Sequence, residues 1–309
     1  MSDSTYPLVT VITPTYNRGP FLAETIESVL AQNYPNLEYI VLDDGSTDDT
    51  LAVVRPYRHR LRYERHENQG ETRTVNKGWS KARGDFIMVV NSDDPILPGL
   101  LPTAVEFMER HPELLMVYPD WIVIDAKSKP IQTVQALDYD YQEMIKIWGC
   151  VPGPGALMRR RAIELEPSRD IRYRYVADFE YWLRLGLHGP FARLPKVLAT
   201  HRHHGDSAGV AQAARIAREL VALAHEFFDR PGLPDDIRRL RRRALASAHF
   251  DAATRCNASF FGYYKHLLGS IAYHPLVGLT KAVRHPLVPF RIHFAQKWKP
   301  VLRQFVPQK

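Results

Sequence analysis

Apolar and polar residues alternate along about the first hundred positions in two rhythms, one typical of buried strands and one typical of helices. The strand-like runs span positions 8–17, 37–46, 61–67 and 85–90. Between them, apolar residues recur at intervals of three and four, as do Leu22, Ile26, Val29 and Leu30. This alternation predicts an α/β fold in which helices flank a mostly parallel, Rossmann-like sheet.

The pattern changes in the second half of the chain. A helix is predicted over Leu100–His111 and a strand over positions 114–125, whereas Lys127–Lys146 is polar and poorly periodic. We interpret that segment as a connection, either solvated or folded over a site. Helices are predicted over Val210–Phe228, Asp235–Thr254 and Phe260–Tyr273. The chain is therefore expected to consist of an α/β domain, residues 1–209, and a helical C-terminal region, residues 210–309.

Polar residues follow three of the predicted strands, at Thr13–Asn17, Asp43–Gly45 and Asn91–Asp94. Parallel strands bring such loops to one edge of the sheet, where ligands bind. Asp93 and Asp94 repel each other unless a cation lies close to them, and hard oxygen ligands suit Mg²⁺ or Mn²⁺ with phosphate oxygens completing the shell. A capped turn is the alternative, because Asp-Asp-Pro is also good turn chemistry.

Charge is distributed unevenly along the chain. The net charge is +7, from 41 Lys+Arg and 34 Asp+Glu. Residues 1–209 carry 24 basic and 28 acidic side chains, a net of −4, and residues 210–309 carry 17 and 6, a net of +11. Arg238–Arg243 is a basic run without a nucleic-acid recognition motif, so no nucleic-acid partner is expected. Basic residues interleaved with aromatic ones after Pro286 suit an anionic membrane surface, or the aromatics pack back on the α/β domain.

The chain lacks other sequence signals that would change this picture. Cys150 and Cys256 have no metal-ligand spacing, which favours a reduced, cytoplasmic setting. The amino terminus has no signal-peptide pattern, and no stretch approaches the about 18 apolar residues of a membrane span. The absence of G-x-G-x-x-G after the first strand and of G-x-x-x-x-G-K-[ST] argues against dinucleotide-binding and P-loop proteins.

Four motifs, in this order, carry a family resemblance: VITPTYN, VLDDGSTDDT, NQGETRTVNKGWSKARGDFIMVVNSDD and VADFEYWLRLG. Together they resemble glycosyltransferase family 2, inverting nucleotide-sugar-dependent enzymes with a GT-A fold. The resemblance implies that residues 1–209 form a GT-A nucleotide-sugar-binding and catalytic domain. It implies transfer of a sugar from a nucleotide-diphosphate donor, by family frequency a UDP-sugar, to a saccharide or lipid-linked acceptor in bacterial surface polysaccharide or glycolipid assembly.

The resemblance also implies roles for individual residues. Asp94 would bind Mn²⁺ or Mg²⁺, with Asp93 on the ribose or in the metal shell. Asp44 would accept a hydrogen bond from the base ring N–H. The nucleobase pocket would be lined by Pro14, Thr15 and Tyr16.

Two family motifs are present here in altered form. Many members carry an Arg-Asn pair after the third strand, whereas Val75 precedes Asn76 here, and Arg73 is expected to substitute as a diphosphate or base contact. The family's acidic pair has Ala177 in its first position, which leaves Asp178 as the general base. The alternative interpretation is that Asp178 only stabilises the start of a helix, where a carboxylate is favoured by the helix dipole.

Two further acceptor-side residues follow from the motifs. Glu180 lies one to two positions off the acidic motif and is interpreted as a surface residue. His204 follows Arg202 in an Arg-x-His pattern, and the resemblance implies that it completes the metal shell or contacts the diphosphate. A histidine that is merely exposed at a strand end is the alternative.

Two other function classes are weighed against glycosyl transfer. A nucleotidyltransferase acting on sugar phosphates would share the sheet and the carboxylates, but it should have a basic, Gly-rich first loop, which TPTYNRG is not. A non-catalytic, membrane-associated nucleotide-binding protein would account for the basic tail but not for Asp94 together with Asp178.

Overall fold

The computed structural model describes residues 6–203, 212–256 and 260–276. The chain divides into two compact units. The first unit comprises Met1–Tyr141 and Cys150–Ser207, and the second comprises Gln142–Gly149 and Ala208–Lys309. The predicted metal ligand His204 and the basic tail after Pro286 lie outside the described residues.

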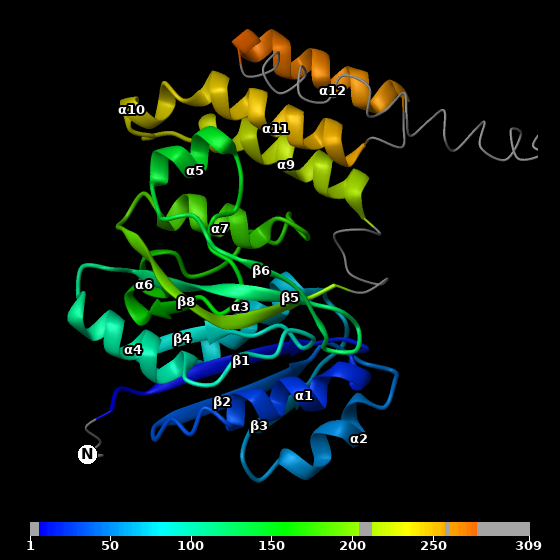
Figure 1. Cartoon of the computed structure of the whole chain (residues 1–309), viewed down its shortest axis with the longest axis vertical. Coiled ribbons are helices and arrows are strands. Elements are labelled where there is room, and N and C mark those ends of the chain that lie inside the picture. Colours follow the sequence, from blue (N-terminus) through cyan, green and yellow to red (C-terminus); the bar gives the residue numbers. More distant parts are fainter. Residues whose placement is uncertain (1–5, 204–211, 257–259, 277–309) are drawn as a thin grey trace, which may run out of the picture. The chain divides into compact units, whose positions relative to one another are not determined.

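The first unit contains, among its described residues, one eight-stranded mixed sheet (Figure 1). Its strands are β1 (Val9–Thr15), β2 (Leu37–Asp43), β3 (Arg62–Arg65), β4 (Phe86–Val89), β5 (Met116–Ile124), β6 (Pro130–Val134), β7 (Leu157–Arg159) and β8 (Phe191–Arg202). The order is β3-β2-β1-β4-β7-β5-β6, with β8 beside β5. The first four strands are parallel, and β7 pairs antiparallel with β4 and β5. The predicted mostly parallel α/β fold is therefore confirmed.

Helices cover both faces of this sheet. They are α1 (Gly19–Leu30), α2 (Thr50–Val54), α3 (Glu71–Lys81), α4 (Leu100–Arg110), α6 (Arg160–Leu165) and α7 (Ala177–Leu185), with a 3₁₀ turn, η1 (Arg55–Tyr57). Helix α3 approaches the sheet closely at Gly78, where a Cβ would lie 2.7 Å from the side chain of Ile12. A larger residue there would push α3, which carries several site residues, away from the sheet.

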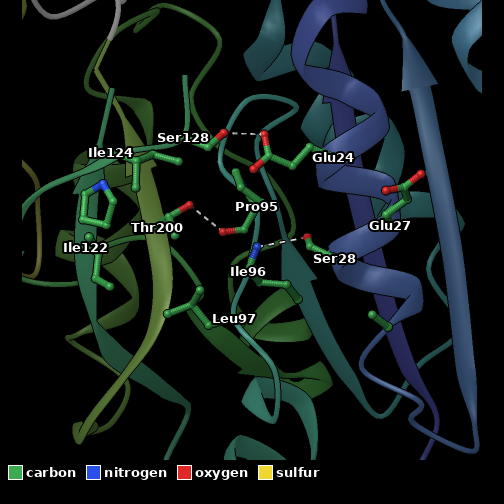
Figure 2. A pocket seen from close by; sticks show the side chains of 12 residues that line it. Glu24, Glu27, Ser28, Pro95, Ile96, Leu97, Ile122, Ile124, Ser128 and Thr200 are labelled. Carbon is green, nitrogen blue, oxygen red and sulfur yellow. Dashed lines mark hydrogen bonds between the residues drawn. The ribbon is translucent and has the colours of Figure 1, made fainter. Parts of the chain in front are cut away.

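The loop between β4 and α4 is fastened on two sides. On one side, the Thr200 hydroxyl of β8 donates to the Pro95 carbonyl (2.5 Å). On the other, the Ile96 N–H donates to Ser28 Oγ of α1 (3.0 Å). Figure 2 shows both bonds at a pocket of about 410 Å³, lined mostly by apolar side chains. Because Pro95 directly follows Asp94, these bonds also hold the carboxylate-bearing loop in place.

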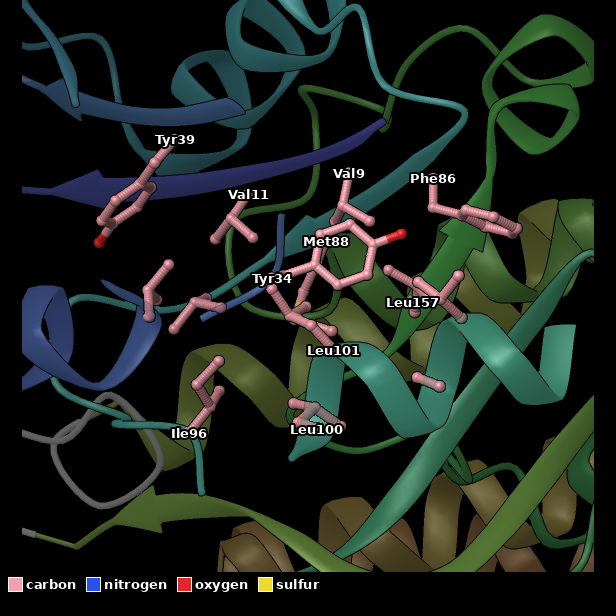
Figure 3. Close-up of a cluster of buried hydrophobic side chains, with 14 of the residues drawn as sticks. Val9, Val11, Tyr34, Tyr39, Phe86, Met88, Ile96, Leu100, Leu101 and Leu157 are labelled. Carbon is pink, nitrogen blue, oxygen red and sulfur yellow. The ribbon is translucent and has the colours of Figure 1, made fainter. Parts of the chain in front are cut away.

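The main core of the first unit lies between the sheet and the helices α1 and α4 (Figure 3). Side chains from β1 and β4, such as Val9, Val11 and Met88, meet the apolar side of α4 at Leu101. The predicted apolar stripe of α1 is buried in the same cluster; it consists of Leu22, Ile26, Val29 and Leu30. Burying such side chains contributes about 1.5–3 kcal/mol each, so this layer fixes the strands whose ends carry the site.

The predicted connection over Lys127–Lys146 is wrong in part. The segment contains β6 and most of α5 (Tyr141–Ile147). Strand β6 pairs with β5, yet Pro130, Ile131, Gln132 and Thr133 are all exposed, so the strand has no buried face to give an alternating pattern. Helix α5 has only seven residues, too few for a clear helical period.

The described part of the second unit is helical. Besides α5 it contains α9 (Ala213–Phe228), α10 (Asp235–Arg238), α11 (Arg241–Arg255) and α12 (Phe260–Tyr273). Residues 142–149 belong here because Trp148 is buried, donates from Nε1 to the Leu220 carbonyl (3.0 Å) and packs against Phe227 and Phe228. The helix predicted over Asp235–Thr254 is two helices, since Leu240 N–H bonds three residues back, to Ile237. None of the described helices is long and apolar enough to cross a membrane.

A histidine pair in the second unit predicts that the stability of this unit depends on pH. His249 Nδ1 lies 3.1 Å from His266 Nδ1, and the His249 ring stacks on Tyr273. Burial, and then the charges of His266, His225 and Lys265, lower the pKa of His249 to about 4. Above about pH 6.5 the ring is neutral in both the folded and the unfolded state, and folding has no protonation cost. As the pH falls from 6.5 toward 4 the unfolded state binds the proton first, so the free energy of unfolding decreases.

We therefore expect thermal unfolding followed by circular dichroism to occur at a lower temperature at pH 5 than at pH 7.5. His249→Gln should reduce this difference, because it removes the group that must remain neutral. His59→Gln, at an exposed position of the first unit, is the matched control and should leave the difference unchanged. An undiminished pH difference in His249→Gln would contradict the assignment.

Candidate active site

The loops after β1 and β2 are joined by hydrogen bonds. Asn17 N–H donates to Ser46 Oγ (3.0 Å), and Thr47 N–H donates to Asn17 Oδ1 (2.8 Å). Asn17 has a φ of 51°, a conformation that Asn adopts more readily than most residues. This turn directs the chain from β1 into α1 and brings the first two polar loops together.

The loop after β4 lies against the loops that follow β1 and β2. Arg18 Nε lies 3.3 Å from Asp93 Oδ2, and the Thr25 hydroxyl donates to the Ser92 carbonyl (3.1 Å). The three polar strand ends that the sequence pattern predicted to converge therefore do so. Contacts from α1 hold the third loop against the first.

Asp94 is almost fully buried, at 4% exposure, and both of its oxygens have partners. Oδ1 accepts the Arg202 N–H (2.6 Å), and Oδ2 accepts from the Asn91 amide (3.0 Å) and lies 3.5 Å from His201 Nδ1. The bond with Asp94 is the largest cause raising the pKa of His201; burial opposes it, and the charges of Asp94 and Asp93 add to it. The histidine found beside Asp94 is thus His201, and the predicted ligand His204 lies outside the described residues.

The side chain of Arg202 holds the loop after β4 in place. This side chain is fully buried, and it donates to the Asp93 carbonyl (2.7 Å), the Asp125 carbonyl (3.1 Å) and the Glu24 carboxylate (2.6 Å). The sequence analysis matched Arg202 only as part of a histidine motif. Its structural role needed the pairing of β8 with β5, which the sequence pattern did not predict.

The predicted nucleobase residues lie at the ends of β1 and β2. Pro14 and Thr15 are buried, and Tyr16 is 45% exposed. Asp44 Oδ1 accepts the Gln69 N–H (2.8 Å) and Oδ2 accepts the Gly70 N–H (2.9 Å). A carboxylate oxygen can accept more than one hydrogen bond, so the predicted contact to a base remains open to Asp44.

Two buried polar atoms near Asp44 have no hydrogen-bond partner among the described residues. They are Thr15 Oγ1 and His66 Nε2, and the other ring nitrogen of His66 lies 3.4 Å from Asp44 Oδ1. Buried polar groups are normally paired, so unpaired ones here suit a ligand that supplies the missing partners.

The altered Arg-Asn motif lies on α3. Val75 is buried and Arg73 is exposed, so the expected substitution by Arg73 stays a prediction. Asn76 instead binds the backbone of Arg169 in both directions: its amide donates to the Arg169 carbonyl (2.9 Å), and its Oδ1 accepts the Arg169 N–H (2.8 Å). The guanidinium of Arg169 lies over the Trp79 ring, 5.5 Å from its centre.

The predicted general base lies in the first turn of α7. Asp178 is partly buried, and its Oδ1 accepts the Phe179 N–H (2.7 Å). The interpretation of Glu180 as a surface residue is wrong. Glu180 is 1% exposed, and both of its oxygens accept from Arg184, at 2.6 and 3.0 Å. A buried ion pair of this kind is structural, because removing one partner leaves an uncompensated charge.

Glu71, at the start of α3, is a site residue that the sequence analysis missed. Its side chain reaches solvent, yet the surrounding protein displaces enough water that desolvation is the largest cause raising its pKa. The charge of Arg169 opposes this rise, and those of Asp178, Asp93 and Asp94 add to it. Glu71 thus lies within electrostatic range of both the β4 loop and α7. It follows the third parallel strand, so the strand-end rule that selected the other loops could also have selected this one.

Comparison with known proteins shows the family. Residues 10–165 match the sequence model described as glycosyl transferase family 2, and the chain belongs to this family. An uncharacterized glycosyltransferase of Rickettsia typhi is 27% identical over 209 residues, 65% of this chain and 64% of that protein. Chondroitin synthase of Escherichia coli is 26% identical over 208 residues, 66% of this chain and 30% of the synthase. The matched region thus spans less than two thirds of each relative.

Solved structures show the fold. TarS 1–349 of S. aureus in complex with UDP-GlcNAc superimposes with a TM-score of 0.69 at 20% identity, over 94% of this chain and 87% of that one. A mannosyltransferase of Pyrobaculum calidifontis in complex with GDP-Man and Mn²⁺ gives 0.59 at 20% identity, over 95% and 89%. The fold is therefore the GT-A glycosyltransferase fold.

Proposed function

We propose that this chain transfers a sugar from a nucleotide-diphosphate donor to an acceptor hydroxyl, with inversion at the anomeric carbon. The observation that carries the proposal is that the loops after β1, β2 and β4 meet at one edge of the sheet, where Asn17 N–H donates to Ser46 Oγ and Arg18 Nε lies 3.3 Å from Asp93 Oδ2. The segment that leads into α7 and Asp178 is bonded to the first turn of α3 through Thr72 and Tyr173, so we assign the carboxylate pair to the donor and Asp178 to the acceptor of one reaction.

The donor nucleotide is assigned to the loops after β1 and β2. Thr15 Oγ1 and His66 Nε2, which have no hydrogen-bond partner within the described part of the chain, support a polar ligand beside Asp44, and Pro14 and Tyr16 would line the base. Neighbouring structures solved with UDP-GlcNAc and with GDP-Man support a nucleotide sugar as the ligand class. We assign a UDP-sugar as the first donor to test.

A divalent ion, Mn²⁺ or Mg²⁺, fits the end of β4. Asp93 and Asp94 offer carboxylate oxygens, the donors that such ions prefer, and His201 Nδ1 lies 3.5 Å from Asp94 Oδ2. Within the described residues no three His, Cys, Asp or Glu side chains form a complete ligand set, so phosphate and water would have to complete the shell of an ion bound here. When bound, such an ion acts as a Lewis acid that neutralises charge on the leaving diphosphate.

Asp178 is assigned as the general base. The acceptor oxygen forms a bond to the anomeric carbon while the bond from that carbon to the diphosphate oxygen breaks, and the acceptor proton passes to the Asp178 carboxylate. A single in-line displacement of this kind inverts the configuration without a covalent intermediate. A positioned base contributes about 10²–10⁴-fold to such a rate.

The experiment is a panel of nucleotide sugars incubated with the full chain and Mn²⁺, with and without EDTA. Release of free nucleoside diphosphate that stops in EDTA and returns with added Mn²⁺ is the expected result. Release of pyrophosphate instead would identify a nucleotidyltransferase. No turnover of any donor would leave only nucleotide binding and would overturn the proposal.

We also propose that the protein acts in the cytoplasm, at the inner face of the cell membrane, on a saccharide or lipid-linked acceptor of surface polysaccharide or glycolipid assembly. The net charge of +11 over residues 210–309 supports attraction to anionic lipids. Deleting residues 286–309 should reduce binding to anionic liposomes, most at low salt, while donor hydrolysis stays measurable. Neutral liposomes are the control, and unchanged binding to anionic ones would contradict the idea.

A further inference from the structure

A buried arginine atom on the Asp178 side of the candidate site lacks a hydrogen-bond acceptor. Arg169 Nε has no partner among the described residues, although it is shielded from solvent. Leaving such a donor unpaired costs about 1–3 kcal/mol, more for a charged group. A ligand that brings an acceptor to Arg169 would recover this cost.

The arginine is held in place before any ligand arrives. Asn76 fixes its backbone on both sides, and its guanidinium lies 5.5 Å from the centre of the Trp79 ring, which is 2% exposed. Stacking on an aromatic ring suits a guanidinium and leaves its edge free to donate hydrogen bonds. Little conformational entropy would then be lost when Arg169 binds an anion.

The segment that carries Arg169 is bonded to both α3 and α7. The Thr72 hydroxyl of α3 donates to the Tyr173 carbonyl (3.0 Å), and the Asp170 N–H donates to Glu180 of α7 (3.4 Å). Arg169 therefore lies beside Asn76 and Trp79 of α3, on the segment that leads past Thr72 of α3 into α7, which carries Asp178. Its charge acts on Glu71 together with that of Asp178, in agreement with this place.

We propose that Arg169 binds an anionic group of the acceptor, a phosphate or a carboxylate. The inference rests on the proposed function, in which the donor diphosphate leaves on the Asp94 side and the acceptor enters on the Asp178 side. A planar guanidinium pairs with either oxyanion through two parallel hydrogen bonds. Glu71 and Asp178 would repel an anion, and the positive charge of Arg169 offsets this repulsion.

The kinetic test compares Arg169→Gln with Arg161→Gln, a change at an exposed position of α6. Each variant is assayed with acceptors matched in pairs: a neutral methyl glycoside, the same sugar carrying a phosphate, and the corresponding uronic acid. We expect Arg169→Gln to raise the KM of the anionic acceptors about tenfold or more while the neutral acceptor changes little. Arg169→Lys should restore part of the difference, and the phosphate and uronic acid arms identify which oxyanion is preferred.

A binding measurement separates this inference from the proposed function. Glucuronate and inorganic phosphate are titrated calorimetrically into the full chain in the presence of Mn²⁺ and saturating UDP. Binding that is lost in Arg169→Gln and kept in Arg161→Gln supports the anion site even if no nucleotide sugar is turned over. If transfer occurs but the preference for anionic acceptors survives in Arg169→Gln, or if that variant loses UDP affinity instead, the inference is overturned.

Discussion

Asp178→Asn is expected to lower the turnover number by about a hundredfold or more, while the dissociation constant of the donor stays within about twofold. The amide cannot accept the acceptor proton, but it has nearly the same shape, and its oxygen can still accept the Phe179 N–H. The donor is assigned to the loops after β1, β2 and β4, which α7 does not form. A loss confined to the chemical step is how an interaction made only in the transition state appears in kinetics.

The matched control is Glu164→Gln, which changes an exposed carboxylate on α6 and should leave turnover unchanged. Glu180→Gln is a different kind of variant, because it removes the charge that pairs with Arg184 in the interior. It should lower the free energy of unfolding by about 3 kcal/mol, which denaturant unfolding would detect. An active Asp178→Asn enzyme beside an inactive, well-folded Glu180→Gln enzyme would move the base to Glu180.

The parallel half of the sheet could be predicted because its evidence is local. Strands β1, β2 and β4 are buried on both faces and therefore form continuous apolar runs, and α1 shows a clear helical stripe. Strand β6 could not be found in this way, since four of its five residues are exposed. The position of β8 beside β5 depends on contacts between residues far apart in the chain, which no periodicity reports.

Some residues of the candidate site could be predicted from the sequence and others could not, for the same reason. Asp44, Asp93 and Asp94 directly follow predicted strands, so their convergence could be predicted from topology alone. The clamp between Asn76 and Arg169 joins residues 93 positions apart, and nothing in either local sequence indicates it. The burial of Glu180 was missed for a related reason. Its partner Arg184 is one helical turn away, but the residues that cover the pair are not adjacent to it in the sequence.

Asp94→Asn is expected to abolish measurable transfer while leaving the fold intact. Turnover should fall by about a hundredfold or more, because the neutral amide is a poor ligand for the divalent ion proposed at this position. The loop should keep its place, since the Arg202 side chain still binds the Asp93 carbonyl and the Thr200 hydroxyl still binds the Pro95 carbonyl. Turnover measured against Mn²⁺ concentration should show no saturation in the variant. The variant should still unfold cooperatively, at a somewhat lower temperature, because an amide cannot accept both the Arg202 N–H and the Asn91 amide.

Asp49→Asn is the matched control for this prediction. It makes the same carboxylate-to-amide change at an exposed position before α2, where the side chain caps no helix N–H. It should retain the Mn²⁺ dependence of the wild-type protein, and EDTA should inhibit it reversibly. Full activity of Asp94→Asn, or unchanged turnover of the wild-type protein in excess EDTA, would show that the reaction does not need an ion at Asp94. The charge of the leaving diphosphate would then have to be neutralised by side chains alone, and Arg18, which lies 3.3 Å from Asp93, would be the first arginine to test.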